Sequence, residues 1–346
     1  MMEIFRSAMV ALLASLFCLY LLRPLAVSIG LVDRPDERKQ HINHVPLIGG
    51  LVIFFGFCFS LLTLHISLMQ YRGLLAGAIL LVLMGVLDDF HNISSRLRLA
   101  GHLIASLFLV IWSGALLAHL GNFLFIGDFN PGLWALPLTI VIIMANINAM
   151  NMVDGQDGLA GGIALGQCAL LAWLAYQVKN FHDLRLLIIL GVLLLVFLSF
   201  NMRAPWRKTA AIFLGDAGST LLAFLLVWFA IRLSQMDLVN LRPIVILWVM
   251  SFPLFDLLNV VIYRASRGQS VFRAGRDHVH HVLHVAGIDA SLSTLLLVFF
   301  SVSLGLIGLM LNYLRLAEAW QFLLWLIILT GYLLGVHISR NRYEQK

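Results

Sequence analysis

Residues Asn148 to Ala160 read NAMNMVDGQDGLA and connect two apolar runs that are each long enough to cross a membrane. Within eleven positions the stretch carries two asparagines and two Asp-Gly pairs. Acidic and amide side chains at the end of a membrane helix are costly to bury and usually mark a functional site. Two other acidic clusters, Asp88-Asp89 in GVLDDF and Asp216 in FLGDAGST, occupy similar positions. We therefore predict that the three clusters meet at one membrane face and form a magnesium-phosphate site.

The composition predicts an all-α polytopic membrane protein with a single domain over residues 1–346. Of these residues 61% are hydrophobic and 12% are charged, and apolar stretches of roughly 20 residues recur along the whole chain. The first apolar run ends in Arg23-Pro24 without a small-residue cleavage site, so we expect no cleaved signal peptide. The three cysteines lie in apolar runs and predict no disulfide framework. The net charge of +6 is too diffuse to indicate nucleic-acid binding.

Hydropathy predicts about eleven transmembrane helices. Their approximate positions are 4–27, 47–66, 73–88, 99–118, 132–149, 158–177, 184–200, 211–231, 243–262, 291–312 and 319–338. With alternating sides, 16 of the 23 Lys and Arg residues fall on the side of the C-terminus, so the positive-inside rule predicts an outer N-terminus and a cytoplasmic C-terminus. Every dense polar cluster then lies at the cytoplasmic face. This one-sided distribution favours an enzyme over a transporter, because a transporter places polar groups near the bilayer midplane. The density of ionisable groups argues against a structural membrane subunit.

Asp88 and Asp89 close the third predicted span. Adjacent side chains on a helix diverge by about 100°, so we expect the helix to end at this pair if both carboxylates face one ligand. A solvated helix end is the alternative interpretation. Two acids at a helix C-terminus oppose the macrodipole and require a compensating cation, which favours a functional pair.

The other two acidic motifs also favour a cation site. A helix cap would explain Asp157 but not the second acid, Asp154, or the amides of Asn148 and Asn151. Carboxylate and amide oxygens are ligands that suit magnesium. Asp216 is expected about 8 Å inside its span, at 1.5 Å per residue, where a carboxylate needs a partner or a metal. A helix-packing patch with one satisfied Asp is the alternative at that position.

The loop after the ninth span carries two arginines and three clustered histidines, Arg273, Arg276, His278, His280 and His281. Such side chains on one loop form an anion-binding array, so we predict that they bind a diphosphate. Zinc binding and a simple positive-inside signal are the alternatives. The histidine spacing and the lack of a nearby cysteine argue against zinc.

Isolated polar residues elsewhere carry weaker signals. Asp256 is a lone acid beside Pro253 in the ninth span, and two interpretations stay open: a buried hydrogen-bonded residue, or part of an entrance for a lipid phosphate. Four separate histidines are expected to be interfacial or packing residues without a role in the site: His65, His102, His119 and His337.

The four motifs together resemble the polyprenyl-phosphate N-acetylhexosamine-1-phosphate transferases, of the glycosyltransferase family 4 type. VLDDF, NAMNMVDGQDGL, FLGDAGS and RxHxHH carry the resemblance in this order, and it covers most of the chain. The chain is most similar to the bacterial branch that transfers N-acetylglucosamine-1-phosphate. HVPLIGG and Phe90-His91 depart from the pattern of the muropeptide-transferring branch. Both departures argue against a muropeptide substrate. The alternatives to UDP-N-acetylglucosamine are other UDP-N-acetyl sugars, of the FucNAc or QuiNAc type, and UDP-MurNAc-pentapeptide.

The resemblance implies a role for each motif residue. The magnesium ligands would be Asn151 and Asp216, and manganese can substitute for magnesium. The catalytic acids would be Asp88, Asp89, Asp154 and Asp157, with Asp88 as the preferred base for the lipid phosphate and the latter two beside the nucleotide. The substrate-binding residues would be Asn148, Arg276, His278, His280 and His281.

The resemblance also implies the substrates and the location. A UDP-N-acetylhexosamine and undecaprenyl phosphate would react in the bacterial cytoplasmic (inner) membrane, at an active site that faces the cytoplasm. The product would start an O-antigen, common-antigen or other cell-envelope glycan. A one-step route and a covalent aspartyl route both stay open. Membrane lipid would surround the chain, a homodimer is compatible with it, and no nucleic acid is expected.

Overall fold

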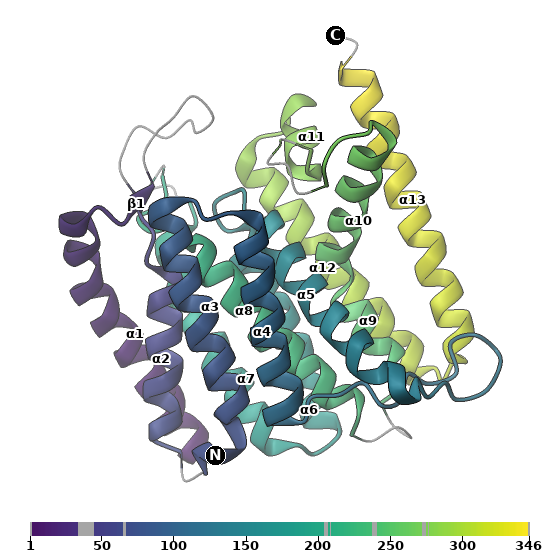
Figure 1. The fold of residues 1–346 in the computed structure, drawn as a ribbon, viewed down its shortest axis with the longest axis horizontal. Helices are drawn as coiled ribbons and strands as arrows, with labels where there is room; N and C mark the ends of the chain where they lie inside the picture. Colours follow the sequence, from purple (N-terminus) through teal and green to yellow (C-terminus); the bar gives the residue numbers. More distant parts are fainter. Residues whose placement is uncertain are drawn as a thin grey trace.

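The structure, a computed structural model, describes residues 2–33, 45–64, 67–203, 207, 209–236, 241–271, 275 and 277–344. Helices dominate the described chain, from α1 (Met2–Ile29) at one edge of the bundle to α13 (Glu318–Glu344) at the other (Figure 1). The other helices are α2 (Gly49–Leu62), α3 (Arg72–His91), α4 (Ser95–Ser113), α5 (Ala135–Val153), α6 (Leu159–Gln177), α7 (Phe181–Asn201), α8 (Gly215–Ser234), α9 (Ile244–Val249), α10 (Ser251–Ser266), α11 (Val279–Val285) and α12 (Ala290–Tyr313), with 3-10 turns η1 (Leu68–Tyr71) and η2 (Gly132–Trp134). Strands β1 (Val32–Asp33) and β2 (Val45–Pro46) form a small antiparallel pair.

Each predicted span coincides with one helix or with two consecutive helices. Among the described residues, nine helical segments are long and apolar enough to cross a membrane. α2 is shorter, with 14 residues, and the ninth predicted span is divided into α9 and α10 at Met250. The prediction of an all-α polytopic membrane protein is confirmed, whereas the number of crossings and the orientation stay predictions.

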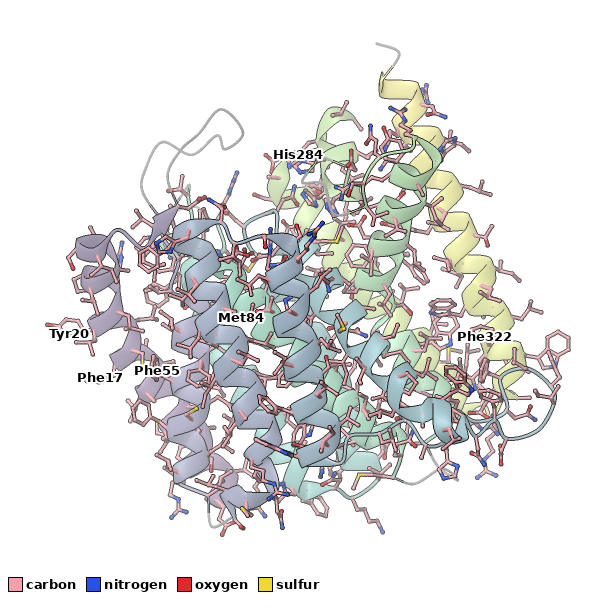
Figure 2. The ribbon with its side chains drawn as sticks, in the orientation of Figure 1. Phe17, Tyr20, Phe55, Met84, His284 and Phe322 are labelled. Atoms are coloured by element: carbon pink, nitrogen blue, oxygen red, sulfur yellow. The ribbon has the colours of Figure 1, made fainter. Side chains whose placement is uncertain are left out.

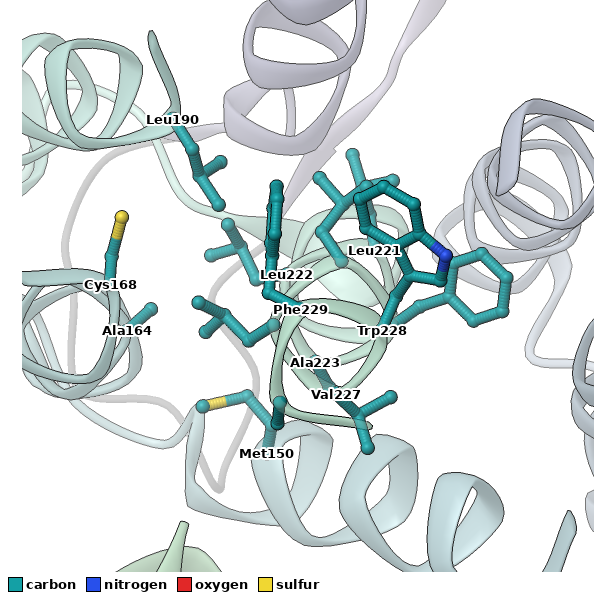
Figure 3. Close-up of a cluster of buried hydrophobic side chains, with 14 of the residues drawn as sticks. Met150, Ala164, Cys168, Leu190, Leu221, Leu222, Ala223, Val227, Trp228 and Phe229 are labelled. Atoms are coloured by element: carbon teal, nitrogen blue, oxygen red, sulfur yellow. The ribbon is translucent and has the colours of Figure 1, made fainter. Parts of the chain in front are cut away.

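α8 is the central helix of the bundle. In its apolar window 94% of the residues are buried, compared with 28% in α1 and 11% in α13. A helix that is apolar on all sides is stable only when other helices or lipid surround it. Figure 3 shows Leu222 and Phe229 of α8 among side chains of α5, α6 and α7. The outer helices instead present apolar side chains to the surroundings, as Phe17 and Tyr20 do on α1 (Figure 2).

Small residues bring α8 against α3 at the end of the bundle that holds the acidic motifs. A Cβ atom on Gly85 of α3 would overlap the backbone of Ala217, so the two helices approach as closely as backbones can. Gly215 begins α8 with a φ of 73°, a left-handed conformation that favours glycine. A Cβ atom there would lie 2.6 Å from Oδ2 of Asp89. This approach places the first turn of α8 beside the last turn of α3.

The structure corrects three predicted helix boundaries. α3 does not end at the Asp pair but continues to His91, where Asn92 caps it in a left-handed conformation. α5 continues to Val153, so Asn151 lies on a helix and not in the junction. The loop after α10 contains the short helix α11. Hydropathy misses such ends because polar side chains in a last helical turn can find partners on other helices.

Candidate active site

A cavity of about 330 Å³ opens at the end of the bundle where α3, α5 and α8 meet the segment around α11. Its wall includes residues from all four predicted motifs: Asp88, Asn148, Asn151, Asp216, His278, His280 and His281. Met84 of α3 also lines it, and Figure 2 shows this residue together with His284 of α11. Motifs that lie up to about two hundred positions apart in the chain therefore share one cavity in the fold.

Asp216 is the second residue of α8 and is held from two sides. Its backbone N–H donates to Oδ1 of Asp89 over 3.0 Å, and its own Oδ1 accepts a 2.7 Å bond from Nδ2 of Asn151. Asn151 also donates to the hydroxyl of Ser219 over 3.0 Å. The positive end of the α8 dipole favours carboxylates at this position. The predicted metal residues thus contact one another directly.

The Asp pair diverges along α3, and its two members serve different neighbours. Asp88 lines the cavity, where Oδ1 accepts from the backbone N–H of Ile93 at 2.9 Å and Oδ2 lies 3.1 Å from Nε of Arg98. Asp89 points to the start of α8 and is not on the cavity wall. Within the described chain, Oδ2 of Asp89 is buried and receives no hydrogen bond, whereas Oδ2 of Asp88 is paired with Arg98. An unsatisfied buried acceptor such as Oδ2 of Asp89 requires an explanation, and a bound cation supplies one.

Asp154 and Asp157 lie in the turn between α5 and α6. Burial, followed by the charges of Asp216 and Asp89, raises the pKa of Asp154 well above its ordinary value. Asp157 instead forms an ion pair with Arg203, in which Nε of Arg203 donates to Oδ2 of Asp157 over 2.8 Å. Neither residue is part of the cavity wall. Asp154 therefore belongs electrostatically to the acidic cluster, whereas Asp157 is paired beside it.

The acidic cluster has the chemistry of a magnesium site. Asp88, Asp89, Asp154 and Asp216 bring several carboxylates together, and mutual repulsion favours a bound cation. No group of three or more His, Cys, Asp and Glu side chains forms a ready metal cage within the residues that the structure describes. Magnesium does not need one, because it usually binds through one or two carboxylates, waters and substrate phosphates. The oxygen donors here fit that mode.

The opposite wall of the cavity is formed by the histidine segment. His278 is the N-cap residue of α11, and its Nδ1 lies 2.8 Å from Oδ2 of Asp256. Burial, followed by the neighbouring histidine charges, lowers the pKa of His280 to about 3, so its ring is neutral at physiological pH. His280 Nε2 is buried, and no hydrogen-bond partner for it exists in the described part of the chain. The predicted substrate residue Arg276 lies outside the described residues.

Three cavity residues were missed by sequence reasoning. Arg264 is 3% exposed and donates from Nε to Oδ2 of Asp277 over 2.8 Å, although the sequence indicated only a topology signal. Arg98 pairs with the candidate base. His102, expected to be a packing residue, lies on the cavity wall 3.3 Å from Nδ2 of Asn148. The spacing of Arg98 and His102, four residues apart on one helix face, was a signal for both.

Comparison with known proteins agrees with this arrangement. Residues 71–234 match the model of glycosyl transferase family 4. The undecaprenyl-phosphate alpha-N-acetylglucosaminyl 1-phosphate transferase of Yersinia pestis is 31% identical over 328 residues, which cover 95% of this chain and 89% of that enzyme. The enzyme of the same name from Escherichia coli (strain K12) is 29% identical over 335 residues, covering 93% and 87%. That from Haemophilus influenzae is 33% identical over 305 residues, covering 88% and 86%.

The family match includes the Asp pair of α3, the junction after α5 and the start of α8, which together form the acidic side of the cavity. The similarity to named transferases continues over nearly the whole chain and so includes the histidine side as well. The resemblance that the four motifs predicted is confirmed. This chain belongs to glycosyl transferase family 4 and is a phosphoglycosyl transferase.

Proposed function

We propose that this enzyme transfers N-acetylglucosamine-1-phosphate from UDP-N-acetylglucosamine to undecaprenyl phosphate and releases UMP. One observation carries the proposal: a single cavity joins the acidic cluster around Asp216 to a basic wall that contains Arg264 and His278. Two phosphorylated substrates must approach each other in this reaction. A site with acids for a cation on one side and cationic or neutral donors on the other suits two dense anions.

In the proposed reaction, an oxygen of the lipid phosphate attacks the β-phosphorus of the nucleotide sugar. The new P–O bond forms while the bond from this phosphorus to the bridging oxygen breaks, and UMP leaves with the bonding electrons. Asp88 is the preferred base, because it lies on the cavity wall whereas Asp89 does not. It accepts the proton of a monoprotonated lipid phosphate and lies beside Arg98, which attracts that phosphate.

Asp216 and Asn151 would hold magnesium, with Asp154 contributing charge to the same cluster. When bound, the ion supplies electrostatic stabilisation of the transferred phosphoryl group. The basic wall binds the diphosphate. Arg264 is fixed there by Asp277, and the unpaired Nε2 of His280 is a further ligand atom. Because the His280 ring is neutral, it contributes a hydrogen bond and no charge.

The sugar and the location are part of the proposal. The names of the relatives favour N-acetylglucosamine as the sugar and undecaprenyl phosphate as the lipid. The distribution of Lys and Arg favours an inner-membrane enzyme with its cavity open to the cytoplasm. Cysteines introduced at Ser95 and Gln269 should react only with a cytoplasmic reagent, and one at Lys179 only with an external reagent. Labelling of Gln269 from outside would contradict the orientation.

UMP release by purified protein tests the function. Release should require UDP-N-acetylglucosamine, undecaprenyl phosphate and magnesium together, and it should stop on addition of a chelator. Release without the lipid would indicate a hydrolase, and nucleotide-sugar uptake into vesicles without release would indicate a transporter. A panel that includes UDP-MurNAc-pentapeptide and other UDP-N-acetyl sugars tests the substrate. A higher kcat/KM for any of these would replace N-acetylglucosamine in the proposal.

A further inference from the structure

Asp256 is a buried carboxylate that the proposed reaction does not use. It lies on α10, is 1% exposed, and is not part of the cavity wall. Its oxygens face three donors. Oδ2 lies 2.8 Å from Nδ1 of His278, and Oδ1 accepts from the backbone N–H of Val279 at 3.0 Å and from the hydroxyl of Tyr332 at 3.1 Å. A carboxylate that is buried, paired with three donors and off the cavity wall is not placed to meet a lipid phosphate, which decides against the entrance interpretation.

The Asp256 contact determines which atom of His278 can serve a ligand. Because Asp256 accepts the Nδ1–H of His278, Nε2 is the ring nitrogen left for a substrate, and it donates to a phosphate oxygen when the ring carries both protons. The same carboxylate also anchors the next backbone N–H, that of Val279, so both the ring and its peptide are fixed. Carboxylates that orient a histidine in this way control the tautomer and the direction of the ring. His278 itself lies on the cavity wall.

The last helix, α13, contributes to the same arrangement. Tyr332 lies among Phe252, Phe255 and Phe300, with its ring stacked on Phe300 at 6.0 Å, and this packing directs its hydroxyl to Asp256. Two turns later, Arg340 donates to the backbone carbonyl of Asp277 over 2.5 Å. α13 thus contacts Asp256, which holds the His278 ring, and Asp277, the residue before His278.

The attachment of Arg340 is itself rigid. Its guanidinium carbon lies 3.7 Å from the centroid of the Tyr263 ring, a cation–π contact with α10, and the residue is 6% exposed. α13 is otherwise little buried, with 11% of its apolar window covered. Its polar contacts lie at two places: Glu318 and Trp325 near its start bind Asn122 and Ser251, and Tyr332 and Arg340 reach the histidine segment.

We propose that Asp256 is a positioning residue that holds His278 with Nε2 directed to the diphosphate of the sugar nucleotide, and that Tyr332 and Arg340 make α13 part of the active site. The inference rests on the proposed function, because it assigns His278 to substrate binding. Neither Asp256 nor Tyr332 touches the substrate. Both act through the position of one imidazole.

A double-mutant cycle tests the action through His278. Asp256→Asn keeps the size and an acceptor for Val279, but its amide N–H₂ opposes the Nδ1–H, so the ring cannot carry both protons in this position and loses its positive charge toward the diphosphate. We expect kcat/KM to fall by about 10- to 100-fold, as for other lost orienting carboxylates. In a His278→Ala background the same substitution should change kcat/KM by less than about 2-fold. If the two losses in kcat/KM multiplied in the double variant, Asp256 would act independently of His278, and the proposal would be overturned.

Two matched variants control the cycle. Asp289→Asn changes an exposed acid that caps α12, where Asn is an equally good cap, and it should leave kcat/KM unchanged. Tyr332→Phe removes only the hydroxyl and should lower kcat/KM by about 3- to 10-fold. In the His278→Ala background the same substitution should leave kcat/KM unchanged. Tyr313→Phe makes the same change at a position that is 85% exposed and should have no effect.

Hydrogen exchange of the Val279 amide tests the positioning independently of turnover. This N–H donates to Asp256, so Asp256→Ala and Tyr332→Phe should both accelerate its exchange, while amides of α3 keep their wild-type rates. Unchanged protection of Val279 in both variants would overturn the inference. A wild-type enzyme that releases no UMP would count against the proposed function instead, and the exchange rates would still decide whether α13 holds the histidine segment.

Discussion

An acidic residue lies at each end of α8, Asp183 of α7 at one end and Asp216 at the other, and the two have opposite surroundings. Near the C-terminal end of α8, Asp183 of α7 is fully buried and accepts two bonds from Arg232, at 3.1 and 3.2 Å, and one from Asn180 at 2.7 Å. At its N-terminal end, about 24 Å away along 16 residues at 1.5 Å each, Asp216 faces further acids. There, Oδ2 of Asp89 receives no hydrogen bond from the described chain.

The difference separates a structural acid from a functional one. A buried carboxylate that is fully paired stabilises the contact between two helices, and its loss leaves a buried cation without a partner. A group of carboxylates that repel one another destabilises the folded chain until a cation binds. Removing a charge should therefore have opposite consequences at the two ends, and four experiments test this.

Asp216→Asn should have the largest effect on turnover. We expect a loss of at least about 1000-fold in kcat, because the variant loses the central ligand of the proposed magnesium site. Its melting temperature without magnesium should not fall, since one member of a repelling cluster has become neutral. UMP release and a thermal melt in detergent measure the two quantities. Normal activity with normal magnesium dependence would show that Asp216 is not a ligand.

Asp183→Asn should show the reverse pattern. The ion pair with Arg232 is lost while the shape is kept, and we expect a loss of about 2–3 kcal/mol of stability. This is at or below the lower limit of the usual range of about 3–5 kcal/mol, because the Arg232 side chain is 35% exposed and solvent screens the pair. The melting temperature should fall, while kcat per folded enzyme stays at the wild-type value. A large loss of kcat without destabilisation would mean that this end of α8 also takes part in the reaction.

Asp88→Asn should have a smaller effect on turnover that depends on pH. A base contributes about 100-fold or more where the lipid phosphate still carries a proton. The second pKa of a phosphate monoester is near 6, so above about pH 8 the lipid is a dianion and needs no base. The variant should therefore recover part of its rate between about pH 6 and 9, whereas Asp216→Asn should not. Equal recovery in both variants would make Asp89 the next candidate, and no recovery in either would limit Asp88 to a role by position or charge.

Asp154→Asn should change stability by the smallest amount. The pKa of Asp154 is raised well above its ordinary 3.8, so between about pH 4 and the raised value the folded state binds more protons than the unfolded state. Stability without magnesium should then decrease as pH rises through this window. In the Asn variant the decrease in melting temperature between about pH 5 and 8 should be shallower by a few degrees. Equal slopes in chelator for the two proteins would contradict the assignment.

The acidic side of the site was more accessible to sequence reasoning than the histidine side. Asp88 and Asp216 could be found because a charge next to an apolar run is a local signal. The same reasoning could not distinguish Asp154, which joins the cluster, from Asp157, which pairs with Arg203. Nor could it show that Asp256 orients His278, because these residues are 22 positions apart and on different elements.

The sequence by itself determined the class of fold, the order of the helices and the four motifs. The reason is that hydropathy and the cost of buried charge act on neighbouring residues and are visible in any short window. Only the tertiary structure decided where helices end, which acids share the cavity, and that Arg98, His102 and Arg264 lie on its wall. Those features depend on close backbone approaches such as that of Gly85 to Ala217. Such an approach results from the packing of distant segments, so no local pattern encodes it.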